Sequence, residues 1–308
     1  MSADQKQQAQ SSPHADEDAA AAAAAAGTTD TVGFIGCGTI AAAIAEGLAT
    51  QASVPIAHIC VSRRSESKSA ALAARFPALV TVTDRNQDVV DRCDVVFVCV
   101  LPEQTAEVLR SLAFDPARHT VVSLVSTATL AGLAAATALP PGRIYKCICL
   151  PAVARHEGVC LVAPRAADGG GDGRLLPLFR SLGGVVEASD ERQMSAMMVP
   201  SALMGPLYGM LKQSRDWLTT NGGPGLTQSD ASYLVGRMFW GMMQDAERKC
   251  TEDGAFEELI AEQTPGGLNE QALRNWSDLG ALRDLDRVQD ALFDRIAGRT
   301  DGSLRTEE

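Results

Sequence analysis

Short apolar runs alternate with stretches of helical period along the first two-thirds of the chain. Several of these runs, such as DVVFVCVLP, are continuously apolar, which is typical of a strand covered on both faces. Strands that alternate with helices predict right-handed βαβ units and a parallel sheet. The expected strands are 31–35, 57–61, 79–82, 94–101, 120–124 and 144–150, with weaker candidates at 159–162 and 184–187, and the expected helices include 66–75, 103–112 and 130–136.

The pattern changes after residue 189, because only helical periods follow. Apolar residues, many of them methionine, recur at helical spacing over 191–220, and a stripe of this kind is more typical of a core than of a cofactor site. Because these helices are more hydrophobic than a small separate domain requires, we expect a subunit interface. The predicted fold class is α/β, with a Rossmann-type parallel sheet in 31–189 and an all-helical dimerisation domain in 190–298 whose further helices lie near 228–250, 256–263 and 279–297.

Both ends of the chain are expected to lack fixed structure. Residues 1–30 are polar and low in complexity, and they include a run of eight alanines at 19–26. Such a segment cannot bury enough apolar surface to offset the conformational entropy lost on ordering. Residues 299–308 are predicted to be a flexible tail, and the run DGGGDG at 168–173 a surface loop. The first segment has no arginine and three consecutive acidic residues, which makes a poor organelle signal and favours a cytoplasmic location.

Charge and cysteine usage exclude some classes of protein. A net charge of −11 argues against nucleic-acid binding and against docking on anionic lipid. No apolar run approaches the ~18 residues of a membrane helix, so none is expected. The eight cysteines lie mostly in apolar runs, which suits buried thiols in a reducing compartment.

One cysteine cluster has the composition of a metal site. Cys147 and Cys149 would point to one face of a strand, and His156 and Cys160 follow closely. The spacing matches no known zinc module, and three core thiols with a loop histidine explain it as well. We therefore predict no metal site.

The segment GFIGCGTIAAAIAEG places a G-x-G-x-x-A motif between a strand and a helix. Gly36 allows the tight turn, Gly38 lets the backbone approach a pyrophosphate, and Ala41 lets the helix pack close to the strand. The helix that begins near Thr39 would direct its N–H groups and its dipole at phosphate. The alternative is a strand–turn–helix connection that serves only close packing. The position of the motif at the start of a βαβ unit favours dinucleotide binding.

The end of the second strand bears on the choice of cofactor. An NAD site usually has a carboxylate here, whereas this chain has Ser62 followed by Arg63, Arg64 and Lys68. Ser62 can donate a hydrogen bond, and the arginines can pair with a 2′-phosphate. A solvated basic loop is the alternative. We expect NADP(H) to be preferred, with NAD(H) possible.

Five motifs in order resemble the pyrroline-5-carboxylate reductase family, within the larger group of 6-phosphogluconate-dehydrogenase-like oxidoreductases. They are GFIGCGTIAAAIAEGL, VSRRSESK, VFVCVLPEQ, ICLPAVARHEG and EQTPGGLNEQAL, between about residues 32 and 295. The resemblance implies a Rossmann domain and a helical domain that dimerises, with the active site between one subunit's cofactor and the partner's helical domain. It implies NAD(P)H-dependent reduction of the C=N bond of 1-pyrroline-5-carboxylate to proline, a step of proline biosynthesis.

The resemblance also implies roles for particular residues. One group of residues would bind the pyrophosphate, the adenosine ribose and the nicotinamide of the cofactor. The TPGG segment would bind the substrate carboxylate, and Asn269 would contact the imine nitrogen. Independently of the resemblance, Pro-Gly-Gly before a helix exposes N–H groups that can bind an anion, although an interhelical turn explains it equally. The cofactor residues are Gly36, Cys37, Gly38, Thr39, Ile40, Ser62, Arg63, Arg64, Val100, Leu101 and Pro102, and the substrate residues are Thr264, Gly266, Gly267, Asn269 and Tyr208.

The chain departs from the family pattern at polar contact positions. Leu101, Ala152 and Leu268 replace a lysine, an asparagine and a threonine, and the stretch 202–208 keeps only its Gly-Pro pair and Tyr208. A reductase of another cyclic imine or of a 2-oxo acid is one alternative, since Leu101, Leu203, Met204 and Leu268 would make a less polar pocket. A dimeric NADP-binding protein without turnover is the other.

Overall fold

The computed structural model describes residues 30–51, 53–165 and 172–304. The predicted N-terminal tail up to residue 29, the glycine-rich loop up to residue 171 and the chain end beyond residue 304 lie outside these ranges. Contacts divide the chain into two units after Met198, whereas the sequence pattern changes after residue 189, because the helix that follows Asp190 packs on a strand of the first unit.

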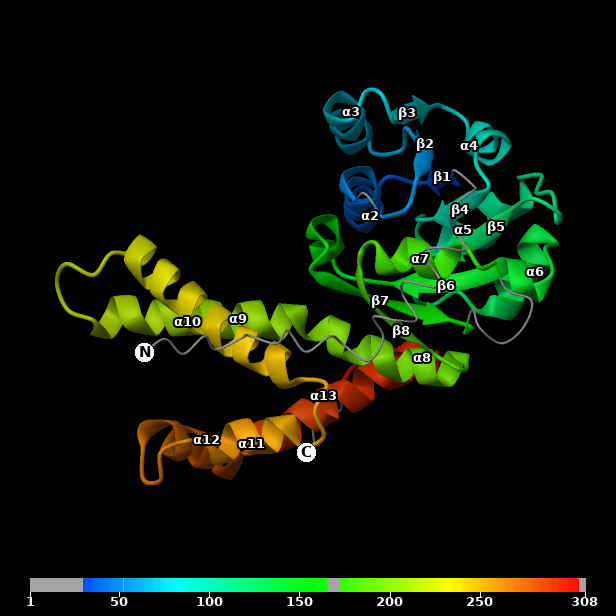
Figure 1. The fold of residues 1–308 in the computed structure, drawn as a ribbon. Coiled ribbons are helices and arrows are strands. Elements are labelled where there is room, and N and C mark those ends of the chain that lie inside the picture. The colour runs from blue at the N-terminus through cyan, green and yellow to red at the C-terminus, as the bar shows by residue number, and fades with distance from the viewer. Residues whose placement is uncertain (1–29, 52, 166–171, 305–308) are drawn as a thin grey trace, which may run out of the picture. The chain divides into compact units, whose positions relative to one another are not determined.

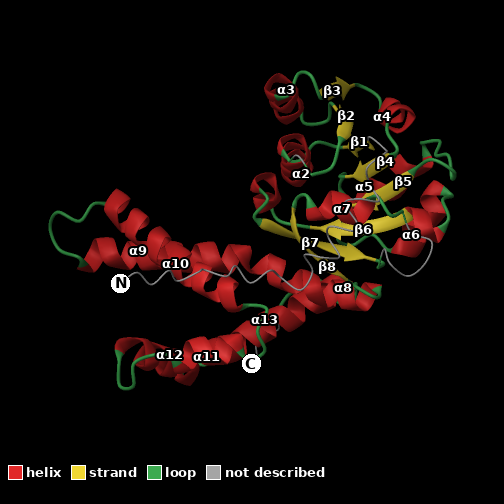
Figure 2. Ribbon diagram, viewed as in Figure 1, coloured by secondary structure: helices red, strands yellow, loops and turns green. Residues whose placement is uncertain are grey.

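The described residues of the first unit form one eight-stranded sheet with the order β3-β2-β1-β4-β5-β6-β7-β8 (Figures 1 and 2). The order of the first six strands is that of a doubly wound Rossmann sheet, and these six are parallel. Each predicted strand is found within a few residues of its expected place. The strands are β1 (Asp30–Ile35), β2 (Ile56–Ser62), β3 (Val80–Thr83), β4 (Val95–Val98), β5 (Thr120–Ser123), β6 (Ile144–Ile148), β7 (Gly158–Ala163) and β8 (Gly183–Glu187).

The chain reverses direction between β6 and β7. These two strands pair antiparallel, and β8 then runs parallel to β7. Their connection contains only the 3₁₀ turn η2 (Pro151–Arg155), which is too short for the crossover that a parallel pair requires. The expected parallel arrangement therefore holds for β1 to β6, and the last two strands depart from it.

Helices cover both faces of the sheet, as the alternation of side chains along the strands requires. Phe34 faces a core that includes α2, α3 and α7, whereas the next residue, Ile35, faces a core that includes α4, α5 and α6. Phe34 stacks on Phe97 of β4 with their ring centroids 4.9 Å apart. The helices of this unit are α2 (Thr39–Thr50), α3 (Glu66–Arg75), α4 (Asn86–Arg92), α5 (Pro102–Arg110), α6 (Leu130–Thr137), α7 (Leu175–Arg180) and α8 (Glu191–Met198).

The second unit is helical, as predicted, but buries little of itself. In Figure 1, α9 and α10 lie side by side, and no residue of α9 is buried. The expectation that the methionine stripe forms a core is correct for Met194 and Met198 of the first unit, whereas Met210 of the second unit is only half-buried. The elements are η3 (Val199–Leu203), α9 (Met204–Asn221), α10 (Gln228–Lys249), α11 (Ala255–Ala261), α12 (Leu268–Asp278) and α13 (Ala281–Ile296).

One helical stretch, Glu191–Asn221, is long and apolar enough to cross a membrane by length and composition, with a mean hydropathy of 1.2. The sequence pattern predicted no membrane helix and did not single out this stretch, which meets the criterion by length and composition only. The reason is that apolar residues here recur at helical spacing among polar ones rather than in one continuous run. This is weak evidence for a membrane, because a core helix of a soluble protein meets the same criterion.

A buried polar network ties the N-terminal ends of the central strands together. Asp172 accepts hydrogen bonds from Thr120 Oγ1 at 2.6 Å and from Arg174 Nη2 at 2.6 Å, and its N–H donates to the Tyr145 hydroxyl at 3.1 Å. Arg143 Nη1 lies 3.6 Å from the same carboxylate. Burial alone raises the pKa of Asp172, but the hydrogen bonds from Arg174 and Thr120 outweigh it and leave the pKa below its usual value.

We expect Asp172→Asn to lower the free energy of unfolding at neutral pH by about 3 kcal/mol, because Arg174 loses the buried carboxylate to which it donates its hydrogen bonds. Since the folded pKa is lowered, the stabilisation is present above the unfolded pKa of about 3.9 and is lost as the pH falls through the folded value. Urea unfolding at neutral and acid pH measures both effects. Glu107→Gln, which changes an exposed carboxylate of α5, is the control. Equal unfolding free energies for Asp172→Asn and wild type at neutral pH would contradict the role of the network.

Candidate functional site

The turn between β1 and α2 is so tight that glycine is required at its first position. Gly36 has φ +94°, in the left-handed region, and a Cβ there would lie 2.5 Å from the carbonyl oxygen of Cys99. The backbone of β1 also meets this strand end directly, because Cys99 N–H donates to Ile35 O at 2.9 Å. The first glycine of the motif therefore holds β1 against the C-terminal end of β4.

The second glycine of the motif meets the requirements of a phosphate site. Gly38 is the N-cap of α2, it provides no side-chain cap, and a Cβ at this position would have no heavy atom within 4 Å. The first turn of α2 carries no acidic residue. The N-terminal N–H groups and the positive end of the helix dipole are thus open to an anion.

The corner lies at the topological switch point of the sheet. The chain goes outward from β1 to β2 on one side and to β4 on the other, and ligands of open α/β sheets bind at this crevice. Ser62, at the end of β2, is buried, and its hydroxyl oxygen accepts a hydrogen bond from Gly36 N–H at 2.7 Å. Because a hydroxyl can both accept and donate, its own proton can still donate a further hydrogen bond.

The residues predicted to line the nicotinamide side follow β4. Val100 is buried, Leu101 is 52% exposed, and Pro102 is the first residue of α5. Leu101 is the N-cap of that helix and offers no polar side chain. This edge of the crevice is therefore apolar, and an apolar edge favours a hydrophobic contact with a ring over a hydrogen bond.

The basic residues after β2 differ in whether they are free to bind a phosphate group. Arg63 is paired, with its Nε 2.5 Å from Asp84 and its Nη1 3.9 Å from Glu66. Arg64 is exposed and has no ion pair among the residues that the structure describes. Lys68 reaches across to α2 and donates to Thr39 Oγ1 at 2.6 Å. From the sequence, Lys68 was interpreted only as part of a basic cluster. Its contact with Thr39 was not predicted, because a contact between the first turns of two helices leaves no pattern in the local sequence.

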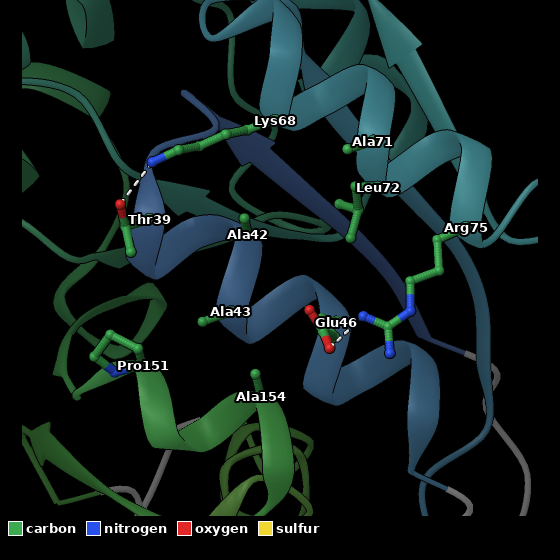
Figure 3. Close-up of a pocket in the computed structure, with 10 residues that line it drawn as sticks. All are labelled: Thr39, Ala42, Ala43, Glu46, Lys68, Ala71, Leu72, Arg75, Pro151 and Ala154. Atoms are coloured by element: carbon green, nitrogen blue, oxygen red, sulfur yellow. Dashed lines mark hydrogen bonds and ion pairs between the residues drawn. The ribbon is translucent and has the colours of Figure 1, made fainter. Parts of the chain in front are cut away.

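A pocket of about 380 Å³ extends along α2, between α3 and η2 (Figure 3). Figure 3 shows Lys68 bound to Thr39 at one end and the ion pair of Arg75 with Glu46 at the other. Alanines of α2 and α3 form much of the wall between them. Sequence reasoning assigned small residues of α2 only to close packing, so this hollow was not predicted.

The predicted substrate residues all belong to the helical unit. Gly266 has φ +72°, and Gly267 is the N-cap of α12 without a side-chain cap. The helix begins at Leu268, and both Thr264, which precedes it, and Asn269, in its first turn, are exposed. Tyr208 is exposed on α9. The geometry of this turn fits an anion-binding site.

Glu270 was not predicted to take part in this turn. Its Oε2 accepts a hydrogen bond from Gly266 N–H at 2.5 Å. A carboxylate at the first turn stabilises the helix, but it occupies an N–H group that a substrate carboxylate would need. Acidic residues in first turns are common caps, so the sequence pattern alone gave no reason to single it out.

Comparison with known proteins adds the family context. The family described as "NADP oxidoreductase coenzyme F420-dependent" matches residues 31–127. Pyrroline-5-carboxylate reductase 2 of Rattus norvegicus is 29% identical over 184 residues, which cover 59% of this chain and 57% of that protein. Pyrroline-5-carboxylate reductase of Pseudomonas aeruginosa is 26% identical over 276 residues, which cover 88% of this chain and 97% of that protein.

The fold is also similar to that of solved pyrroline-5-carboxylate reductase structures. The crystal structure of Plasmodium falciparum pyrroline carboxylate reductase with NADP bound superposes with a TM-score of 0.71 at 17% identity, covering 89% of this chain and 98% of that one. The sheet, the glycine corner and these matches define the class, which is a Rossmann-type dinucleotide-binding protein of the oxidoreductases. Within that class, the chain is similar to pyrroline-5-carboxylate reductases, at 26–29% identity.

The two glycines of the motif should respond differently to alanine. We expect Gly36→Ala to lower the free energy of unfolding by about 2–3 kcal/mol, because of its positive φ and the Cys99 carbonyl. Gly38→Ala should leave stability within about 0.5 kcal/mol and weaken NADPH binding by about tenfold or more, because its methyl group occupies the phosphate approach. Urea unfolding and titration calorimetry measure the two effects. Unchanged NADPH affinity in Gly38→Ala would exclude this corner as the pyrophosphate site.

Proposed function

We propose that the protein is an NAD(P)H-dependent imine reductase whose substrate is 1-pyrroline-5-carboxylate and whose product is L-proline. The observation that carries the proposal is the open, uncapped N-terminus of α2 at the switch point between β1 and β4. Similarity to pyrroline-5-carboxylate reductases along most of the chain supports the choice of substrate.

The cofactor proposed is NADP(H). The N–H groups at the start of α2 would bind the pyrophosphate, and Ser62 would donate to the adenosine ribose. Arg64 and Lys68 are the cations best available for a 2′-phosphate, since Arg63 must first leave Asp84. When bound, the nicotinamide supplies the hydride that reduces the C=N bond.

The chemistry asks little of side chains, because a protonated imine already accepts a hydride. Val100 and Leu101 would exclude water from the ring, and Pro102 fixes the start of α5 behind them. At the substrate, Gly266 and Gly267 would hold the carboxylate after Glu270 yields its N–H, and Asn269 would hydrogen-bond to the imine nitrogen. Thr264 and Tyr208 are the remaining polar candidates.

The helical unit is proposed to form a homodimer or a higher homo-oligomer. Tyr233, Trp240 and Met242 of α10 are exposed large hydrophobic residues, and single chains rarely leave so many on one helix. The proposed location is the cytoplasm, since all cysteines of the described residues are free thiols.

A less polar substrate is the second candidate, favoured by a specific observation. Leu101 is 52% exposed and Leu268 is 84% exposed, at positions where a lysine and a threonine would offer polar contacts. Exposed leucines at such positions suit another cyclic imine or a 2-oxo acid with an apolar substituent. An NADP-binding dimer without turnover is the third candidate.

The choice between cofactors depends on the arginines. We expect the double variant Arg63→Ala and Arg64→Ala to weaken NADPH binding by about 10- to 100-fold, because a charge-assisted contact with the 2′-phosphate is lost. NADH binding should change by less than about threefold. Titration calorimetry with both cofactors measures this, and Arg110→Ala on α5 is a matched exposed control. Equal losses for the two cofactors would refute the 2′-phosphate assignment.

The substrate is tested by NADPH oxidation in the presence of 1-pyrroline-5-carboxylate. We expect turnover, and we expect Asn269→Ala to lower kcat/KM by about 10- to 100-fold, because the hydrogen bond to the imine nitrogen is lost. Asn275→Ala, exposed on the same helix α12, is the control. Turnover only with other imines or 2-oxo acids would favour the less polar substrate. No turnover with any of these compounds would favour the NADP-binding dimer without turnover.

A further inference from the structure

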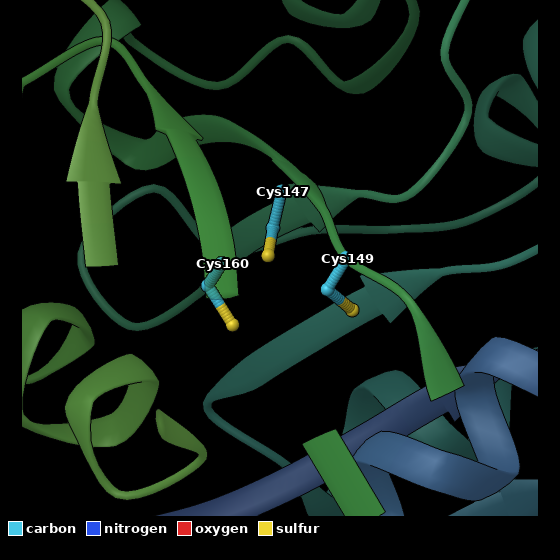
Figure 4. Close-up of side chains that lie close together, drawn as sticks. All are labelled: Cys147, Cys149 and Cys160. Atoms are coloured by element: carbon cyan, nitrogen blue, oxygen red, sulfur yellow. The ribbon is translucent and has the colours of Figure 1, made fainter. Parts of the chain in front are cut away.

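Three cysteine sulfurs meet in the core of the first unit (Figure 4). Cys147 lies on β6, Cys149 directly follows that strand, and Cys160 lies on β7. Their Sγ atoms are all within 4.8 Å of one another. The sequence pattern grouped these residues with His156 and favoured ordinary core thiols.

The reversal of β7 is what brings the three together. Cys147 pairs with Val162 and Ile148 with Leu161, so the next position along the antiparallel ladder sets Cys149 opposite Cys160. Residues two apart on a strand share a face, which places Cys147 on the same side. Histidine 156 is not part of the group, because its Nδ1 contacts Ser181 O at 2.8 Å and its Nε2 contacts Thr50 Oγ1 at 3.1 Å.

The surroundings exclude hard cations. All three cysteines are buried within the apolar core that also holds Phe179 and Val162. Among the residues that the structure describes, no carboxylate or imidazole ligand atom joins the group. Magnesium and calcium require several oxygen ligands, whereas thiolates select soft ions such as Cu(I) and Zn(II).

We propose that Cys147, Cys149 and Cys160 form a three-sulfur binding site for a single Cu(I) ion. An ion about 2.3 Å from each of three sulfurs sets them about 4 Å apart, so the group needs only a small contraction. Zinc in structural sites takes four ligands, and the fourth is lacking within the described group. Cu(I) is a d¹⁰ ion that accepts three-coordination, and its exchange for thiol protons releases those protons to solvent.

Cys149 is the least buried of the three cysteines, so an entering ion would meet its sulfur first.

The test uses the full reduced chain, loaded anaerobically with Cu(I) and challenged with the Cu(I) chelator bathocuproine disulfonate. We expect about one equivalent of copper to be retained, with a sulfur-to-copper charge-transfer absorption, and an excess of Zn(II) not to displace it. Cys147→Ala and Cys160→Ala should each lower retention by about tenfold or more. Cys250→Ser, which changes the exposed cysteine, should retain copper as wild type does.

A second measurement on the wild type covers the case in which the alanine variants fail to fold. X-ray absorption of the copper-loaded protein should show three sulfur neighbours and no nitrogen or oxygen shell. Two sulfurs, a mixed shell, displacement by zinc, or equal retention by folded Cys147→Ala and Cys160→Ala would each overturn the proposal. Its outcome is independent of the proposed reductase activity, which uses none of the three cysteines.

Discussion

The structure depends on the close meeting of three strand ends at Gly36. Its N–H donates to Ser62 at the end of β2, and its α-carbon lies against the Cys99 carbonyl after β4. Only a residue without a side chain fits there, and this contact lets β1 end where α2 can begin with its N-terminus open. The geometry of the corner at the switch point, where α2 begins, follows from that one constraint.

The molecule divides into a well-packed half and an exposed half. Two apolar layers and the Asp172 network hold the sheet, so the corner is fixed by rigid elements on every side. The helical unit buries little, and its turn at Gly266 and Gly267 already has Glu270 as a partner. This contrast agrees with the proposal that the first unit binds the cofactor and that the helical unit forms a dimer.

Much of the fold was predictable from the sequence, because strand and helix periods are local. The corner was predictable because Gly36 and Gly38 act through backbone geometry. The direction of β7 was not, since pairing orientation depends on connection length in space rather than on period. The contact of Lys68 with Thr39 and the pairing of Arg63 with Asp84 were also missed, because both join segments distant in sequence.

The central claim is that this corner delivers a hydride to an imine. The most direct test incubates the protein with NADPH deuterated at the transferred position of nicotinamide C4 and with 1-pyrroline-5-carboxylate, and analyses the product by mass spectrometry. The account predicts proline with a single deuterium on the carbon that was the imine carbon. Binding of NADPH without any deuterated proline would contradict it.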